Sequence, residues 1–305
     1  MKVNTDSMMD DTLCRQITKA ASKQTYYTIR FLVDRNQIPD AYRAYAYFRW
    51  VDDWLDTNAG SKAEKIAFIN RQRSLIDCSY LDQTLPDLLD EEQMLVDLIR
   101  NNEDANSKLQ VYIWNMMAVM TFDAERRGRL VSQQELTNYS HHLAVAVTEA
   151  MHHFIGHDDP PPQHESRYLA VTAAHIVHML RDTVDDLSNG YFNIPREWIE
   201  SYDLDPCAFE SDPYRKWVKN RVQLARSYFR AGRNYLDQVN MRCRIAGYAY
   251  MARFEHVLDM IEMDGYRLRS DYHDGNSLAS GLRMCSAVIA RSLGLTHLQV
   301  VRGES

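Results

Sequence analysis

Apolar residues recur every three to four positions along most of this 305-residue chain, which is the spacing of amphipathic helices. Between residues 10 and 36, for example, Ile17, Ala20, Ile29 and Leu32 repeat at helical spacing. Strand-type alternation is no longer than chance, and 11 glycines with 8 prolines are about half the average usage, too few for many tight turns. The pattern predicts an all-α chain of about ten helices, with a further short helix after Pro195; the main segments are 10–36, 39–54, 62–77, 88–101, 107–128, 132–156, 164–189, 212–238, 241–266 and 275–293.

No low-complexity linker or internal repeat marks a domain boundary. The strongest stop is the stretch from Gly156 to Pro162, whose three consecutive prolines cannot continue a helix. We therefore predict that residues 1–305 form a single domain.

Composition excludes several classes of protein. The net charge of −7 and the lack of a run of five basic residues disfavour nucleic acid as a partner. The mean hydropathy of −0.46 and the lack of 18 consecutive apolar residues predict no transmembrane helix. Five widely spaced cysteines without a CxxC motif indicate free thiols, and the acidic N-terminus is unlike a signal peptide, so we expect a cytoplasmic protein.

Two segments place acidic residues within otherwise apolar helices. In AYAYFRWVDDWLD (residues 44–56), Asp52 and Asp56 are four positions apart, and Arg49 precedes them by one turn. In HIVHMLRDTVDD (residues 175–186), Asp182 and Asp186 repeat this spacing, with Arg181 before them. Like charges at this spacing repel each other, so an inward-facing pair needs compensation.

Mg²⁺ is the natural compensating ion because it takes carboxylate oxygens and completes its shell with water and substrate phosphates. Two such helices facing each other across an apolar cavity would hold a diphosphate through bridging Mg²⁺. Arg49 and Arg181 would bind phosphate oxygens. One acidic pair alone is more often a solvated face, but two pairs, each with an arginine close before it, favour a site.

At these residues the chain resembles the squalene/phytoene synthase family. Residues 44–56 are similar to that family's first Asp-rich motif, and HMLRDTVDDLSNGYFNIPREWIESYDL (residues 178–204) to its second. Residues 136–156, with Tyr139, are similar to the intervening helix, and residues 250–266 to a late helix. The resemblance implies an isoprenoid synthase fold with helices around a central cavity, Mg²⁺ dependence, an isoprenyl diphosphate substrate and head-to-head joining of two prenyl diphosphates.

Roles for individual residues follow from the motifs and this resemblance. Two or three Mg²⁺ ions would be held by Asp52, Asp53, Asp56, Asp182, Asp185 and Asp186, of which Asp52, Asp56, Asp182 and Asp186 are expected to be catalytic. Tyr139 and His178 are expected near the reacting carbons. Arg49, Arg181, Tyr47 and Lys23, with Asp53 and Asp185, are expected to bind substrate. The sequence leaves NADPH dependence, prenyl chain length and oligomeric state open. A hydrophobic isoprenoid product would be consistent with loose contact between the protein and a membrane surface.

The chain also departs from the family pattern. His178 replaces an Asn, and the positions of the family's Arg and Tyr after the second motif carry Tyr191 and Asn193. One alternative is therefore prenyl transfer to a non-isoprenoid acceptor, such as an aromatic molecule, with His142, His175 and His178 lining the acceptor site. Lesser alternatives are a non-catalytic binding protein and a di-iron site at Glu149 and His152, which has no second Glu-xx-His. The roles of His141, His142, His152 and His153 stay open.

Overall fold

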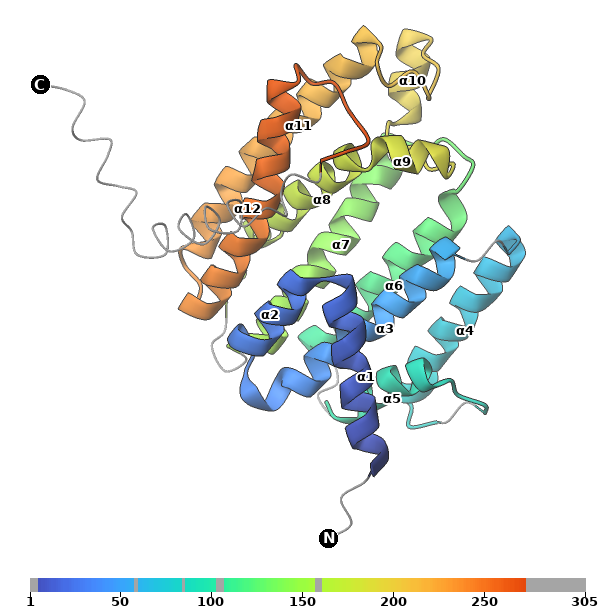
Figure 1. Cartoon of the computed structure of the whole chain (residues 1–305), viewed down its shortest axis with the longest axis vertical. Helices are drawn as coiled ribbons and strands as arrows, with labels where there is room; N and C mark the ends of the chain where they lie inside the picture. The colour runs from blue at the N-terminus through green and yellow to red at the C-terminus, as the bar shows by residue number, and fades with distance from the viewer. Residues whose placement is uncertain (1–4, 58–59, 84–85, 103–106, 157–160, 273–305) are drawn as a thin grey trace, which may run out of the picture. The chain divides into compact units, whose positions relative to one another are not determined.

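The part of the chain described by a computed structural model, residues 5–57, 60–83, 86–102, 107–156 and 161–272, is helical and contains no strand (Figure 1). This confirms the predicted all-α class. In chain order the helices are α1 (Thr5–Ala21), α2 (Lys23–Leu32), the 3-10 turn η1 (Arg35–Gln37), α3 (Ile38–Thr57), α4 (Lys62–Tyr80), α5 (Asp90–Arg100), α6 (Lys108–Arg126), α7 (Gln133–Phe154), the 3-10 turn η2 (Glu165–Tyr168), α8 (Leu169–Arg181), α9 (Thr183–Ser188), α10 (Arg196–Tyr202), α11 (Asp212–Leu236) and α12 (Met241–Met263).

Two predicted helices are divided in the structure. The segment 10–36 breaks at Ser22, whose backbone is extended and whose hydroxyl accepts a hydrogen bond from the Thr25 amide at 3.2 Å, capping α2. The segment 164–189 begins as η2 and breaks again at Asp182, between α8 and α9. The helix predicted over 275–293 lies outside the described residues.

The chain divides into two compact units, and each is described by itself. Unit 1 comprises residues 1–125 and 149–158, and unit 2 comprises residues 126–148 and 159–305. The single domain proposed from the sequence stays a prediction.

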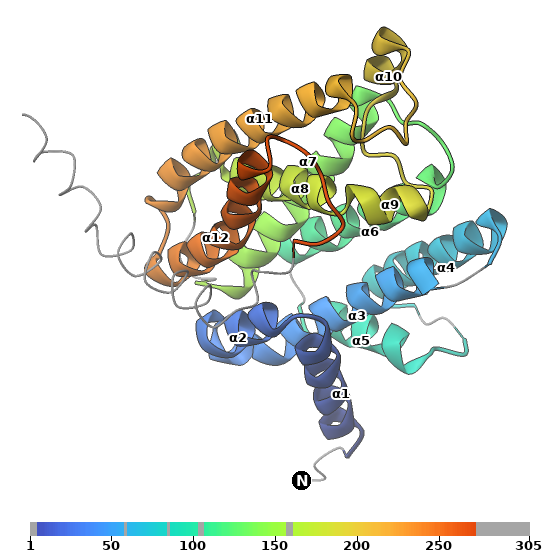
Figure 2. The same ribbon diagram turned by 45° about the horizontal axis from the view of Figure 1, so that its top comes forward.

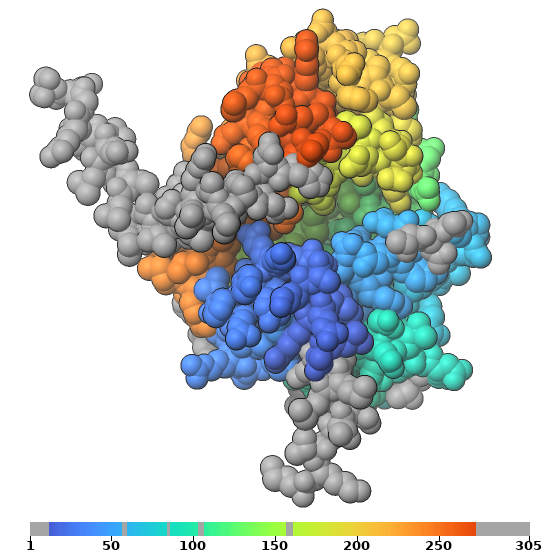
Figure 3. Space-filling view, in the orientation of Figure 1, coloured from blue at the N-terminus to red at the C-terminus, as the bar shows by residue number. Residues whose placement is uncertain are grey.

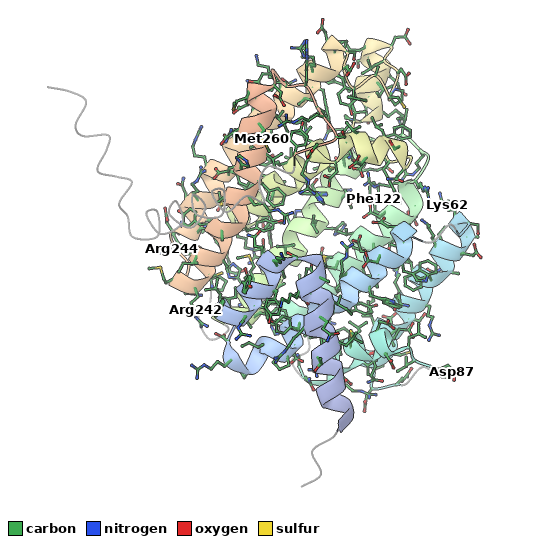
Figure 4. All side chains as sticks on the ribbon, in the orientation of Figure 1. Lys62, Asp87, Phe122, Arg242, Arg244 and Met260 are labelled. Atoms are coloured by element: carbon green, nitrogen blue, oxygen red, sulfur yellow. The ribbon has the colours of Figure 1, made fainter. Side chains whose placement is uncertain are left out.

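Unit 1 is organised around α3, which packs against α1, α2 and α5, while α4 packs against α5. The core face of α3 buries Tyr47, Val51 and Leu55. In the space-filling view, coloured residues of α1 and α2 form part of the visible surface of this unit (Figure 3), whereas Cys14, Thr18 and Ile29 of these helices are buried. A hydrogen bond connects the start of α4 with the last turn of α6: Lys62, labelled in Figure 4, donates to the backbone carbonyl of Glu125 at 3.0 Å.

Unit 2 is organised around α8, which lies alongside α11 and α12 (Figures 1 and 2). Small residues such as Ala173 and Ala174 are fully buried on α8. Gly232 of α11 approaches this helix so closely that an added Cβ would lie 2.7 Å from the Cβ of Ala170. The small residues thus permit the close contact between α11 and α8, and the C-terminal end of α8 carries the second acidic motif.

Within the described ranges, none of the helices combines the length and the apolar character needed to cross a membrane.

Candidate active site

The first acidic cluster lies in unit 1 and contains one more carboxylate than the motif predicts. Asp52 and Asp56 are one turn apart on α3, and Asp123 of α6 acts electrostatically on both. Burial raises the pKa of Asp52 to about 6, and repulsion from Asp56 and Asp123 adds to the rise. Burial and Asp123 also raise the pKa of Asp56, although Arg49 and Lys65 oppose them. The cluster therefore holds more negative charge than its neighbouring cations neutralise. Figure 4 labels Phe122, the neighbour of Asp123 along α6.

Arg49 is the cation within this cluster. Its guanidinium donates to Asp52 Oδ2 at 3.2 Å and to Asp53 Oδ1, and its side chain is partly exposed. The predicted proximity of Arg49 to the acidic residues is thus what the geometry of unit 1 shows. A forked donor beside a carboxylate cluster is suited to the oxygens of a phosphate ligand.

The structure corrects the choice of tyrosine in this motif. Tyr47 has no accessible surface, and its hydroxyl donates to Gln72 Oε1 at 3.0 Å, so it packs as a core residue of unit 1. Tyr45 lies instead on the side of the acidic residues, where Arg49 and Asp52 act on its hydroxyl and Ser22 and Thr25 form hydrogen bonds with it. Because residues two apart lie on nearly opposite sides of a helix, only one of the two tyrosines can share the Arg49 face.

Replacing the two tyrosines is expected to separate their roles. Tyr47→Phe leaves Gln72 Oε1 without its buried donor, so the free energy of unfolding should fall by about 1 kcal/mol while kcat/KM stays close to wild type. Tyr45→Phe should instead lower kcat/KM by about tenfold, the equivalent of one lost hydrogen bond near the substrate, with little change in stability. Urea unfolding and steady-state kinetics measure the two effects, and the opposite pattern would restore Tyr47 to the site.

The second acidic cluster lies in unit 2, at the junction of α8 and α9. Arg181 makes a bidentate pair with Asp182 through Nε at 2.5 Å and Nη2 at 2.7 Å, and His178 Nε2 lies 2.8 Å from Asp182 Oδ2. Burial would raise the pKa of Asp182, but these two partners hold it well below its usual range. Asp182 is therefore an ionised carboxylate that is bound by two side chains, Arg181 and His178.

Asp186 lies one turn after Asp182, with its amide 2.8 Å from the Asp182 carbonyl. Burial raises the pKa of Asp186 to about 6, against the opposing effects of a hydrogen bond from Asn193 and the charge of Arg126. Asp185 is exposed. The two carboxylates of this motif thus differ: Arg181 and His178 stabilise the ionised form of Asp182, whereas burial disfavours the ionised form of Asp186.

Three of these neighbours could not be chosen from the motifs. Asp123 and Arg126 lie on α6, and Asn193 follows α9 by five residues. None has a motif of its own, although Asn193 was noted as a departure from the family pattern. Tyr139 is buried in unit 2, where its ring packs edge-on against His175 and under the Arg126 guanidinium.

The remaining candidate residues have diverse surroundings. Lys23 is exposed at the first turn of α2, and His178 is 49% exposed. His175 is buried beside Ser140, at 3.1 Å, and burial holds its pKa well below the usual value, so it is neutral. In unit 2, His141 is exposed against Tyr168, and in unit 1 the backbone carbonyl of His152 accepts a hydrogen bond from Lys108 at 3.3 Å.

The donor sets fit a hard divalent cation that keeps much of its water. Across the described stretches, no three His, Cys, Asp or Glu side chains are arranged to hold a metal ion without help. The acidic clusters offer carboxylate oxygens, and burial disfavours the ionised forms of Asp52 and Asp186 when no cation is bound. Carboxylate oxygens are the ligands that Mg²⁺ takes, with water and substrate oxygens filling the other positions.

Comparison with known proteins gives a consistent result. The family model described as "Squalene/phytoene synthase" matches residues 18–275. Among solved structures, squalene synthase HpnC from Alicyclobacillus acidocaldarius is 19% identical, with a TM-score of 0.68, covering 88% of this chain and 98% of that one. A dehydrosqualene synthase in complex with a ligand is 14% identical, with a TM-score of 0.71, covering 94% and 97%. At these identities the structural likeness establishes the isoprenoid synthase-like fold. No curated protein sequence matches the chain.

Proposed function

Because the chain belongs to the squalene/phytoene synthase family, whose enzymes are prenyltransferases, we propose that it ionises an allylic isoprenyl diphosphate and joins two prenyl diphosphates head to head. The observation that best supports this proposal is the charge state of the two acidic motifs. Arg49 bonds Asp52 and Asp53 in unit 1, and Arg181 bonds Asp182 in unit 2. In each motif burial raises the pKa of one carboxylate to about 6, that of Asp52 in unit 1 and that of Asp186 in unit 2. A divalent cation that carries a diphosphate would stabilise the ionised forms of such buried carboxylates.

Enzymes of this family are typically Mg²⁺-dependent, and in our proposal two or three Mg²⁺ ions are held by Asp52, Asp53 and Asp56 in one unit and by Asp182, Asp185 and Asp186 in the other. When bound, these ions would neutralise the negative charge of a departing diphosphate. Asp123, which was not among the sequence candidates, is added to the first group because it raises the pKa of both Asp52 and Asp56.

The basic side chains would hold the diphosphate itself. Arg49 and Arg181 present planar forks of donors beside the carboxylates, and such forks match phosphate oxygens. Tyr45 lies next to Arg49 and would add a hydroxyl donor. Lys23, exposed at the start of α2, is assigned to substrate binding on the same grounds of charge.

Tyr139 and His178 are assigned to the vicinity of the reacting carbons. The imidazole of His178 is held by Asp182 at 2.8 Å, so its orientation is fixed by a member of the acidic motif. A half-exposed imidazole in that position can accept or return a proton as an allylic cation collapses. The buried ring of Tyr139 would offer an aromatic face or edge to positive charge.

Incubation of the purified enzyme with Mg²⁺ and each prenyl diphosphate from five to twenty carbons, with and without NADPH, tests the proposal by mass spectrometry. A product that contains two prenyl chains would support head-to-head joining and identify the chain length. Diphosphate release with a single-chain product would point to a different acceptor and overturn the head-to-head reaction. If no substrate is consumed in the presence of Mg²⁺, the proposed chemistry is wrong.

A further inference from the structure

A buried arginine lies beside the second acidic cluster, within unit 2, and has no part in the motifs. Arg126 is the last residue of α6, and only 6% of it is exposed. Its guanidinium lies over two aromatic rings, 5.0 Å from the centroid of Tyr139 and 4.8 Å from that of Tyr191. Nη1 donates to Asn193 Oδ1 at 2.9 Å. Burying a cation costs free energy unless other groups compensate its charge. Here the two aromatic rings and Asn193 provide this compensation.

The bond from Arg126 determines which way the Asn193 amide faces. A guanidinium can only donate, so the carbonyl oxygen of Asn193 must point toward it. The amide nitrogen then faces the opposite way, where it donates to Asp186 Oδ2 at 2.6 Å and to the Met179 carbonyl at 3.2 Å. Both of those partners are acceptors, so all three contacts require the same orientation. A flipped amide would place oxygen against the carboxylate.

The segment after Asp186 is attached to the end of α6 by its backbone as well. The Gly128 amide donates to the Gly190 carbonyl at 2.8 Å, and Arg127 Nε donates to the Asn189 carbonyl at 3.0 Å. Asn193 itself is buried, and its bond to Met179 helps to satisfy a carbonyl at the break between α8 and α9. The position of Asn193 is therefore rigid, and its amide is a fixed donor to one oxygen of Asp186.

We infer that Arg126 is a positioning residue, which acts through Asn193 to hold Asp186 Oδ2 and leave the other carboxylate oxygen for a divalent cation. The inference rests on the proposed function only in taking Asp186 as a cation ligand. Groups that hydrogen-bond a metal-binding carboxylate fix its direction, and losing one typically weakens metal affinity 10- to 100-fold. Arg126 touches neither substrate nor metal in this scheme.

A double-mutant cycle measured by metal binding tests the inference. Free Mn²⁺ is titrated by electron paramagnetic resonance in the presence of inorganic diphosphate, for wild type, Arg126→Met, Asn193→Ala and the double variant. Each single change is expected to raise the Mn²⁺ dissociation constant about tenfold. The double variant should bind Mn²⁺ no more weakly than either single variant, because both single changes break the same chain of hydrogen bonds from Arg126 through Asn193 to Asp186. Arg127→Met is the matched control: it removes a contact to the same segment without touching Asn193 or Asp186, and should bind Mn²⁺ like wild type.

Unfolding temperatures are measured in parallel to exclude a merely structural role. Arg126→Lys keeps the charge but cannot reproduce the planar fork, so it serves as the folded variant if Arg126→Met melts early; we expect it also to bind Mn²⁺ more weakly. Wild-type affinity in a folded Arg126 variant, or additive losses in the double variant, would overturn the inference and leave the proposed function intact. Wild-type protein that does not bind Mn²⁺ with diphosphate would overturn both.

Discussion

Replacing Asp52 with Asn is expected to abolish turnover and, without divalent cations, to raise the midpoint of thermal unfolding. The carboxylate is partly buried near Asp56 and Asp123, and its raised pKa means that ionisation is less favourable in the folded protein than in the unfolded chain. Asn keeps the shape and removes that repulsion. As a ligand, however, it lacks the charge that a cation requires, and the loss of several kcal/mol of transition-state stabilisation corresponds to a rate reduction of about 10³-fold.

Diphosphate release and circular dichroism melts in a chelating buffer measure the two effects. Asp40→Asn is the matched control, because Asp40 is also on α3 but forms a buried ion pair with Arg43 at 2.9 Å. That variant should lose stability and keep its activity. An Asp52→Asn enzyme that retains a tenth of the wild-type rate would contradict the role assigned to Asp52.

The local parts of the site were predictable from the sequence. Asp52 and Asp56, or Asp182 and Asp186, are one helical turn apart, so their proximity depends only on backbone geometry. Arg49 follows from the same geometry because it lies three and four positions before Asp52 and Asp53, whereas Arg181 is the sequence neighbour of Asp182. The helix breaks at Ser22 and Asp182 were missed because the apolar periodicity continues across both positions.

The tertiary parts could not be predicted in this way. Asp123 acts electrostatically on Asp52, and Arg126 donates a hydrogen bond to Asn193. Both interactions depend on the position of α6 in the tertiary structure, which the helical periodicity does not specify. Residues 44–56 contain aromatic side chains on every side of the helix, so periodicity could not decide between Tyr45 and Tyr47. The departures at Tyr191 and Asn193 were visible in the sequence, but their common contact with Arg126 was not.

Replacing Asp182 with Asn is expected to abolish turnover as completely as Asp52→Asn, but to lower stability. In the folded protein, Arg181 and His178 stabilise the ionised form of Asp182, so its pKa is depressed. Stability from such a group is present above its unfolded pKa and is lost as the pH falls through the folded value. Asn cannot pair with Arg181, and the loss of charged hydrogen bonds should cost about 1–3 kcal/mol at pH 8.

Urea unfolding of Asp182→Asn and wild type at pH 8 and at about pH 3 measures this difference. The difference should shrink at the lower pH because Asp182 takes up a proton in the unfolded chain, where its pKa is ordinary, while it stays ionised in the folded protein. His178→Gln gives a control, since it removes one partner and leaves the bidentate pair with Arg181. The opposite signs expected for Asp52 and Asp182 make the two measurements diagnostic: both variants should lose activity, yet only one charge opposes folding. Equal stability changes in the two variants would show that the carboxylates share one environment, contrary to the raised pKa of Asp52 and the lowered pKa of Asp182.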